Sequence, residues 1–296
     1  MKQIKKIQNY IFIMPWVVGF LFLTLIPLTF SLIASFTNYD VTSQFTFVGF
    51  ENYSVMFNED VLFWTSLKNT IYYVIISVPI TTVLTIFIAY LLRNDFFGIR
   101  LFRTVYFLPS VLSGVGVYIL WMQLLDPSTG IVNVVLSYLG IQGPNWLTDP
   151  GWTKNSLIFM KTWSVGGGML MYIASMQSIG KSLYEFADLE GASKLTKFFK
   201  ITLPMITPII LFDVVTSIIG GFQIFQEAYV MSTNGGGGPA NSLLFYNLHM
   251  WNKAFKSYEM GYAMGMSWVL FLIVLILTMV ALKISKHYVH YEGDSQ

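Results

Sequence analysis

Two ionisable side chains, Lys161 and Asp213, lie inside long apolar stretches of the sequence. Because a charged group in lipid costs several kcal/mol, such a residue normally contacts an ion partner, a ligand or water. Lys161 and Asp213 can therefore pair with each other, contact a substrate or face water. Two further interpretations stay open, since Lys161 can extend its aliphatic chain to the membrane surface and Asp213 can pack against a neighbouring subunit.

The residue types of known catalytic centres are absent or scattered in this sequence. It has no cysteine, and none of its three histidines pairs with carboxylates at metal-ligand spacing inside an apolar stretch. No phosphate-binding loop, G-x-S-x-G elbow or H-E-x-x-H pattern occurs, and the glycine run 235–238 lacks the lysine of a phosphate site. We therefore expect no catalytic residue, no metal site and no bound cofactor in this chain.

The composition is typical of an integral membrane protein. Of the 296 residues, 55% are hydrophobic and 11% are charged, whereas soluble domains carry about 25% charged residues. A net charge of +2 gives no basic surface for a nucleic acid, so we expect no nucleic-acid partner. The first apolar run extends from Ile7 to Tyr39, which is longer than the core of a signal peptide, and we expect it to remain as a helix.

Apolar segments long enough to cross a bilayer as helices occur six times, since a span needs about 20 residues. We therefore predict an all-α, polytopic membrane protein that forms a single transmembrane domain, residues 1–296. The predicted spans are residues 11–36, 69–92, 104–125, 155–179, 204–226 and 260–282.

Lysine and arginine are distributed unequally between the two sets of loops, which predicts that both termini face the cytoplasm. The flanks on the predicted cytoplasmic side carry Lys2, Lys5, Lys6, Arg93, Arg100, Arg103, Lys181, Lys194, Lys197, Lys200, Lys283 and Lys286. The opposite flanks carry only Lys68, Lys154, Lys253 and Lys256.

Glycines interrupt the fourth and fifth predicted spans, at residues 166–168 and 220–221. Such positions can line a cavity in which freed backbone groups meet water or a ligand. They can equally allow two helices to pack closely. The sequence leaves both interpretations open.

The segment 182–204, between the fourth and fifth predicted spans, has the pattern of a short amphipathic helix followed by a turn. Ser182 with Glu185 predicts a capping box, Gly191 permits a sharp turn, and Pro204 is expected to open the next span. Such a helix can dock on a cytoplasmic partner or lie flat on lipid.

This segment resembles the EAA loop of permeases of binding-protein-dependent ABC importers. Phe186 stands where the family usually has the first alanine. The residues that carry the resemblance are Glu185, Ala187, Gly191, Phe198, Ile201, Leu203 and Pro204.

Further segments are similar to the maltose- and multiple-sugar-type branch of that family, and the resemblance covers about residues 10–286. They are 47–53, Asn69–Thr70, 102–109, Trp121, Gly130–Asn133, Trp146–Leu147, Asp149–Pro150, Gly237–Pro239, Asn241–Ser242 and Gly261–Ala263.

The resemblance implies the type I ABC importer fold, with a cytoplasmic coupling helix between the fourth and fifth spans of a bacterial inner-membrane permease. It implies as partners a second homologous permease, two cytoplasmic ATPase subunits that bind ATP and Mg²⁺, an extracytoplasmic sugar-binding protein and a carbohydrate substrate. The expected ATPase-coupling residues are Glu185, Ala187, Asp188, Gly191 and Ala192.

The resemblance also implies a substrate site on the spans before and after the coupling loop. Aromatic faces there would stack on sugar rings, polar groups would bond hydroxyls, and Lys161 would favour an acidic sugar. The expected residues are Lys161, Trp163, Ser164, Gly167, Ser217, Gly221 and Gln223.

Two alternatives remain. An ABC permease of this branch can carry glycerol phosphate or another small solute. An ion-coupled secondary transporter could use Lys161 and Asp213, but it would need no docking helix, and no inverted repeat is visible in the sequence.

Overall fold

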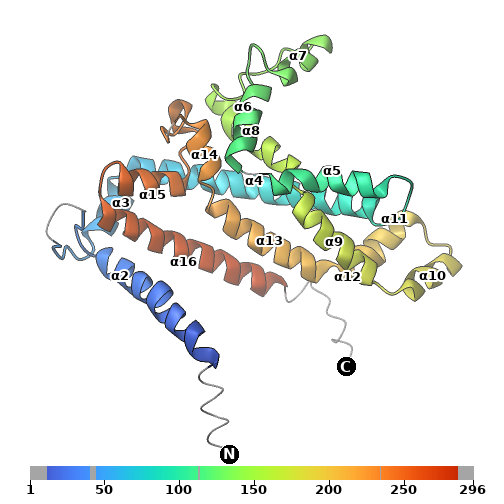
Figure 1. The fold of residues 1–296 in the computed structure, drawn as a ribbon, viewed down its shortest axis with the longest axis horizontal. Helices are drawn as coiled ribbons and strands as arrows, with labels where there is room; N and C mark the ends of the chain where they lie inside the picture. The colour runs from blue at the N-terminus through green and yellow to red at the C-terminus, as the bar shows by residue number, and fades with distance from the viewer. Residues whose placement is uncertain (1–11, 41–44, 113, 234, 286–296) are drawn as a thin grey trace, which may run out of the picture. The chain divides into compact units, whose positions relative to one another are not determined.

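The computed structural model describes residues 12–40, 45–112, 114–233 and 235–285, which form helices joined by loops (Figure 1). The described residues contain no strand beyond an isolated backbone bridge between Thr37 and Phe47. The all-α prediction is therefore confirmed. The chain divides into two compact units, residues 1–63 with 250–272 and residues 64–249 with 273–296.

The helices follow one another through the described residues in this order: η1 (Leu21–Leu25), α2 (Ile26–Ala34), α3 (Glu51–Asn58), α4 (Val61–Leu92), α5 (Ile99–Val111), α6 (Gly114–Leu124), α7 (Ile131–Tyr138), α8 (Pro150–Trp163), α9 (Gly166–Ser178), α10 (Lys181–Leu189), α11 (Lys194–Lys197), η2 (Phe198–Thr202), α12 (Leu203–Met205), α13 (Thr207–Phe222), α14 (Gln226–Met231), η3 (Pro239–Asn241), α15 (Tyr246–Phe255) and α16 (Met260–Ser285).

Several of these helices are long and apolar enough to cross a membrane, which confirms a polytopic membrane fold. Four qualify as single helices: Phe12–Ala34, Val61–Leu92, Thr207–Met231 and Met260–Ser285. Two helix pairs, α5 with α6 and α8 with α9, qualify when each pair is taken as one span, and the second pair bends by 47°. The described residues thus hold four spans, or six with the pairs, and the number six stays a prediction.

The second span begins earlier than the sequence predicted, at Val61 and not at residue 69. The Asp60 carboxylate accepts hydrogen bonds from the backbone N–H groups of Leu62 and Phe63, at 2.9 and 3.0 Å. Asp60 is therefore an N-cap that satisfies two otherwise unpaired donors of the first turn. Lys68 lies within the helix, although the predicted boundary fell just after it.

In the first unit, the chain after α2 is held by α3 and by the start of α16. The side-chain amide of Asn52 donates to the carbonyl oxygens of Ser35 and Thr37, at 2.9 and 2.8 Å. The N–H of Gly261 donates to Tyr39 O at 2.8 Å. A Cβ atom on Gly261 would lie 2.1 Å from Thr37 O, so this contact requires glycine.

The core of the second unit joins α4, α5 and α9 to the segment that leads into α13. Gly166 brings α9 against the backbone of α5, because a Cβ there would lie 2.0 Å from Tyr106 O. Small residues commonly allow such close approach between membrane helices. The buried core residues are Ile86, Ile88, Ala89, Leu92, Ile99, Val165, Met169, Tyr172, Ile173, Met176, Ile179 and Ile206.

Asn69 and Thr70 attach the segment before α15 to α4. The Asn69 amide donates to the carbonyl oxygens of Asn241 and Leu244, at 2.8 and 3.0 Å. The Thr70 hydroxyl accepts from the Tyr246 N–H at 2.9 Å. Both side chains are buried, and buried polar groups need hydrogen-bond partners. These hydrogen bonds therefore give Asn69 and Thr70 a structural role.

The loop after α6 is ordered by Asp126. The hydroxyl and N–H of Ser128, together with those of Thr129, donate to the Asp126 carboxylate and lower its pKa to about 2. A Cβ on Gly130 would lie 2.4 Å from Asp126 O, so the close turn requires glycine. The Asn133 side-chain oxygen accepts from Trp146 Nε1 at 2.7 Å, which ties the next segment to α7.

Candidate functional site

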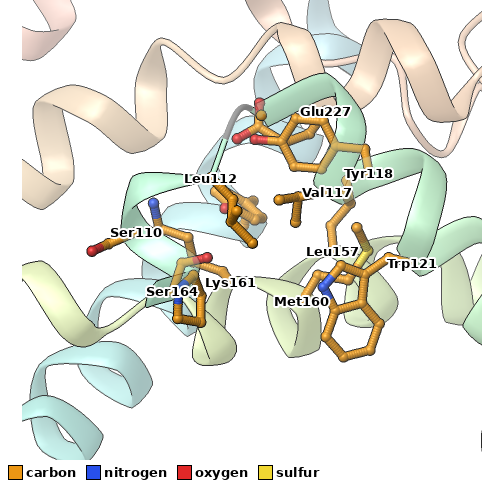
Figure 2. Close-up of a pocket in the computed structure, with 13 residues that line it drawn as sticks. Ser110, Leu112, Val117, Tyr118, Trp121, Leu157, Met160, Lys161, Ser164 and Glu227 are labelled. Atoms are coloured by element: carbon orange, nitrogen blue, oxygen red, sulfur yellow. The ribbon is translucent and has the colours of Figure 1, made fainter. Parts of the chain in front are cut away.

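Two cavities of about 250 and 240 Å³ lie within the second unit, and Tyr73, Lys161 and Glu227 line both of them. The other residues of the first cavity are Pro109, Ser110, Leu112, Gly114, Val117, Tyr118, Trp121, Leu157, Met160 and Ser164 (Figure 2). The other residues of the second are Ser77, Val78, Thr81, Thr216, Ser217, Gly220, Gly221 and Ile224. Both cavities therefore carry hydroxyls and charged groups between otherwise apolar helices.

Four of the seven predicted substrate residues lie at these cavities. Lys161 and Ser164 line the first, and Lys161, Ser217 and Gly221 line the second. Lys161 is thus the predicted residue shared by both spaces. A Cβ on Gly221 would lie 2.8 Å from a methyl group of Val74, so this glycine both lines the cavity and allows α13 to approach α4.

The remaining three predicted residues are not part of either cavity lining. The Trp163 ring contacts the Trp121 ring edge to face, with centroids 5.7 Å apart. Gly167 faces the Ser110 side chain, with 4.0 Å between a built Cβ and that side chain. Gln223 is exposed at the end of α13. Trp163 therefore packs against Trp121, which lines the first cavity.

Glu227, Tyr118 and Trp121 line the first cavity but were not among the predicted site residues. Glu227 lies one residue beyond the predicted end of the fifth span, at residue 226. In the structure it lies in α14, which packs against α6. Figure 2 shows the Tyr118 ring beside the Glu227 carboxylate. No periodic pattern in the sequence predicts the contact between α6 and α14.

Asp213 is bound by two hydroxyl groups of the same chain. Its Oδ2 atom accepts from Thr82 Oγ1 at 3.0 Å and from the Tyr172 hydroxyl at 2.9 Å. Tyr172 is fully buried, and these bonds join α4, α9 and α13. Of the interpretations left open by the sequence, this geometry favours helix packing, with the partners on helices of the same chain.

The amphipathic helix after α9 begins at Lys181, with Gly180 at the N-cap. The predicted capping box of Ser182 and Glu185 is therefore wrong, because Ser182 already lies within the first turn. The helix starts earlier than predicted because the backbone is extended only as far as Ile179 and Gly180 and turns helical directly after them.

The turn predicted at Gly191 is confirmed, and it has the geometry of a Schellman motif. Gly191 has φ +72° and donates its N–H to Asp188 O at 3.0 Å, while Ala192 N–H donates to Ala187 O at 2.9 Å. This pair of bonds closes the helix end, and the left-handed φ favours glycine. An ion pair of 2.5 Å from Lys197 to Asp188 then links the two arms of the turn.

The second arm runs through α11, the π-helical turn η2 and α12 before α13 begins at Thr207. Pro204 lies in α12, so the prediction that it opens the span is wrong. Ser193 caps α11, because its hydroxyl oxygen accepts from the Thr196 N–H at 3.2 Å. The last helix of this arm, α12, has its C-cap at Ile206, directly before α13. We call residues 181–206, from α10 to the start of α13, the elbow (Figure 1).

Arg93, which directly follows α4, fastens the elbow to that helix. Its guanidinium lies 4.3 Å from the centroid of the Tyr90 ring and 5.5 Å from that of Tyr184, as in cation–π contacts. Its Nη1 atom donates to Thr202 Oγ1 at 3.4 Å, and the hydroxyls of Tyr184 and Thr202 are 2.9 Å apart. Both arms of the elbow therefore contact the end of α4.

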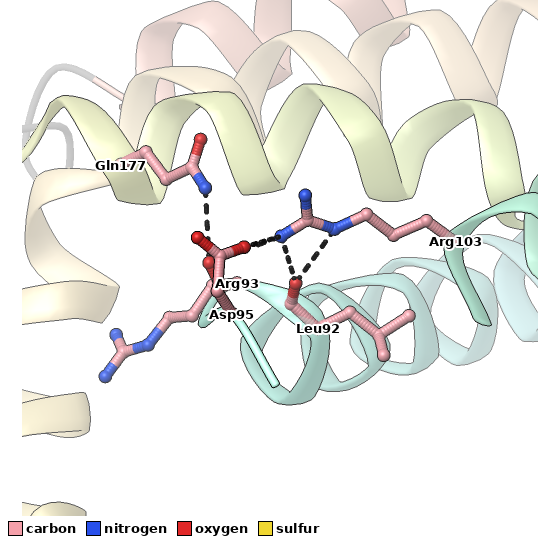
Figure 3. Close-up of polar contacts among 5 residues, drawn as sticks. All are labelled: Leu92, Arg93, Asp95, Arg103 and Gln177. Carbon is pink, nitrogen blue, oxygen red and sulfur yellow. Dashed lines mark hydrogen bonds and ion pairs between the residues drawn. The ribbon is translucent and has the colours of Figure 1, made fainter. Parts of the chain in front are cut away.

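Arg103 and Gln177 hold the same end of α4 from the other side (Figure 3). Arg103 donates to Leu92 O from Nε and Nη2, at 3.2 and 2.8 Å, and its Nη2 lies 3.8 Å from the Asp95 carboxylate. Gln177 Nε2 donates to Arg93 O at 3.1 Å. These donors satisfy carbonyl groups that the helix end leaves unpaired.

An apolar face of α10 is uncovered in this chain. Leu183, Phe186 and Leu189 recur every three residues and are 45%, 67% and 88% exposed. Phe186, the departure from the usual alanine, therefore enlarges this face. Glu185 is also exposed, which leaves its carboxylate accessible beside the apolar residues.

Comparison with known proteins identifies the family. Residues 63–289 match the family described as the binding-protein-dependent transport system inner membrane component. The chain is 38% identical over 293 residues to the probable ABC transporter permease protein YesP of Bacillus subtilis, covering 98% of this chain and 94% of that protein. It is 35% identical over 284 residues to the lactose transport system permease protein LacF of Rhizobium radiobacter, covering 94% of each.

The fold agrees with a solved transporter. A bacterial alginate ABC transporter, crystallised with its alginate pentasaccharide-bound periplasmic protein, contains a chain that superposes with a TM-score of 0.85. The two chains are 23% identical, and the match covers 97% of this chain and 96% of that one. This protein is thus an ABC transporter permease and belongs to the inner membrane components of binding-protein-dependent transport systems.

Proposed function

We propose that this chain forms half of the translocation path of an ATP-driven carbohydrate importer in a bacterial inner membrane. The observation that carries the proposal is the pair of polar cavities that share Tyr73, Lys161 and Glu227 between apolar helices. Hydroxyl-rich solutes need such donors and acceptors when they leave water. Relatives named for lactose and for arabinooligosaccharides support carbohydrate as the substrate class.

The proposed complex contains a second homologous permease, two cytoplasmic ATPase subunits and an extracytoplasmic sugar-binding protein. This chain would be its non-catalytic part, a single domain of six spans with both termini in the cytoplasm. ATP and Mg²⁺ would bind to the ATPase subunits, and this chain would hold no cofactor.

The elbow is proposed to be the coupling element. The exposed face of Leu183, Phe186 and Leu189 would enter a groove of the ATPase subunit, with Glu185 forming polar contacts at its edge. Asp188, together with the turn at Gly191 and its neighbours Ala187 and Ala192, would keep the two arms rigid.

Movement of the elbow would shift helices that line both cavities, because the elbow is continuous with one of these helices and contacts another. Its second arm continues into α13, which carries Ser217 and Gly221. Arg93 fastens both arms to α4, which carries Tyr73 and Ser77. Closure of the ATPase subunits would therefore shift two helices that line the path.

Replacing Lys161 with methionine tests the substrate class. If the substrate is an acidic sugar, the loss of the ammonium group should reduce uptake of an acidic oligosaccharide by about tenfold or more, because hydrogen bonds to charged groups contribute about 1.5–3 kcal/mol. Uptake of a neutral oligosaccharide should change much less. Uptake of radiolabelled trimannuronate and arabinotriose by cells that carry the complete transporter measures both.

Lys68→Met is the matched control, because Lys68 is an exposed lysine of α4 that lines neither cavity. An equal effect of Lys161→Met on both oligosaccharides contradicts recognition of an acidic sugar by Lys161. Failure of the wild-type transporter to import any carbohydrate contradicts the proposed function itself.

A further inference from the structure

An apolar groove of about 510 Å³ lies between the C-terminal half of α4 and the second arm of the elbow. Val83, Phe87 and Tyr90 line it from α4, at a spacing that puts them on one face of that helix. Leu195 and Phe199 line it from the second arm. Apart from Tyr90, these side chains are exposed, so the described part of the chain leaves the groove uncovered. The groove is separate from the exposed face of α10 that the proposed coupling uses.

The two walls of this groove are held together by packing. Ile86 belongs to the buried core of the second unit, and Phe198 and Leu203 pack against that core. The rings of Tyr90 and Phe198 contact each other nearly edge to face, with centroids 4.7 Å apart. The groove is therefore formed by packed helices.

A second space, the basic cavity, has a volume of about 650 Å³ and adjoins the groove, since Tyr90 and Lys194 line both. None of the described residues that line it carries a carboxylate, and its basic residues are Arg93, Lys181, Lys194 and Lys197. Asp188 neutralises Lys197. Lys181 and Lys194 are exposed and form no ion pair with the described residues. Their positive charge therefore favours a bound anion.

The groove and the basic cavity together select one kind of occupant. An inorganic phosphate ion would use the basic cavity and leave the groove open. A zwitterionic lipid would fill the groove but bring no net charge to the lysines. An anionic phospholipid does both, because its acyl chain is as apolar as a leucine side chain and its phosphate accepts hydrogen bonds from ammonium groups. Basic pockets between membrane helices bind such headgroups in other proteins.

We propose that the groove and the basic cavity bind one anionic phospholipid, with an acyl chain along Phe87 and Phe199 and the phosphate on Lys194 and Lys181. The proposed orientation places this end of α4, and with it the lipid, on the cytoplasmic side. The lipid would contact α4 and both arms of the elbow, because Lys181 belongs to α10 and Lys194 to α11. The inference goes beyond the proposed function, since this ligand is not the transported solute.

Photolabelling with phosphatidylglycerol that carries a diazirine in its acyl chain tests the site. The complete transporter is reconstituted in phosphatidylcholine vesicles that contain a small fraction of the probe, and mass spectrometry locates the labelled peptides. We expect label on residues 83–90 and 195–203. Phosphatidylcholine with the same diazirine should label them at least about fivefold less, and Lys194→Gln should lower labelling by phosphatidylglycerol about fivefold, as expected for one lysine that attracts an anionic lipid.

Lys200→Gln is the matched control, because Lys200 is an exposed lysine of η2 that lines neither space, and its labelling should equal that of the wild type. Equal labelling by the two lipids, or equal losses in Lys194→Gln and Lys200→Gln, overturns the site. Label that appears on the permease pair alone and is lost when the ATPase subunits bind also overturns it, since those subunits then cover the basic cavity. Displacement of the lipid by inorganic phosphate at constant ionic strength assigns the cavity to a free anion and overturns the site as well. These outcomes do not depend on the transported solute, so a failure of carbohydrate transport would leave the site standing.

Discussion

Replacing Gly191 with valine should reduce coupled transport at least about tenfold while the protein remains inserted in the membrane. Gly191 has φ +72°, and no atom lies within 4 Å of a Cβ built there, so the obstacle is the backbone conformation and not a lack of space. A left-handed conformation costs an L-residue about 1–2 kcal/mol, and a β-branched residue tolerates it least. The turn should therefore open, and ATP-driven uptake should fall by at least about tenfold, since about 1.4 kcal/mol already shifts an equilibrium tenfold.

Gly140→Val provides the matched control for this experiment. Gly140 also has a left-handed φ, of +73°, and also has open space around a built Cβ, but it lies in the loop after α7. Gly191→Asn should retain most activity, because asparagine tolerates the left-handed conformation. Normal substrate-stimulated ATP hydrolysis in Gly191→Val would contradict the role of the elbow.

Asp213→Ala should destabilise the protein by about 2–4 kcal/mol, because it removes the acceptor for two buried or nearly buried hydroxyl groups. Thr82 and Tyr172 would both lose their partner on α13, and the contacts between three helices would weaken. Thermal unfolding of the purified protein in detergent, followed by intrinsic fluorescence, measures the loss. Tyr172→Phe, which removes one donor and leaves the bond from Thr82, should cost less.

Asp213→Asn separates this structural role from ion coupling. The amide keeps an oxygen acceptor for Thr82 and Tyr172, so ATP-driven uptake should remain within about threefold of the wild type, as expected for a loss near 0.5 kcal/mol. A proton-coupled carrier that used Asp213 would lose transport with this substitution, because an amide does not titrate. Complete loss of uptake in a stably folded Asp213→Asn variant would therefore contradict the assignment of Asp213 to helix packing.

The membrane-spanning organisation was predictable because it follows from long apolar segments, which depend little on tertiary contacts. The start of the second span was not, because Lys68 looked like a flanking charge and the capping role of Asp60 could be recognised only in the structure. The Gly191 turn was predictable from the local preference of glycine. The capping box at Ser182 was wrong because the extended residues before it start the helix earlier.

The candidate cavities were only half predictable. Lys161 stood out because it is a charged residue in an apolar span, and Ser217 was expected only from the family resemblance; both line a cavity. Glu227 did not, because its place at the cavity depends on the packing of α14 against α6, which brings together segments about a hundred residues apart. Contacts of this kind leave no periodic pattern in a single sequence.

The most direct test of the account is to drive uptake in proteoliposomes with ATP or with an ion gradient. We expect accumulation of oligosaccharide only when the partner permease, the ATPase subunits, the binding protein and ATP are all present, and we expect Gly191→Val to reduce it at least about tenfold. Accumulation by this chain alone, driven by a proton or sodium gradient without ATP, would contradict the central claim that work done by a cytoplasmic ATPase enters the membrane helices through the elbow.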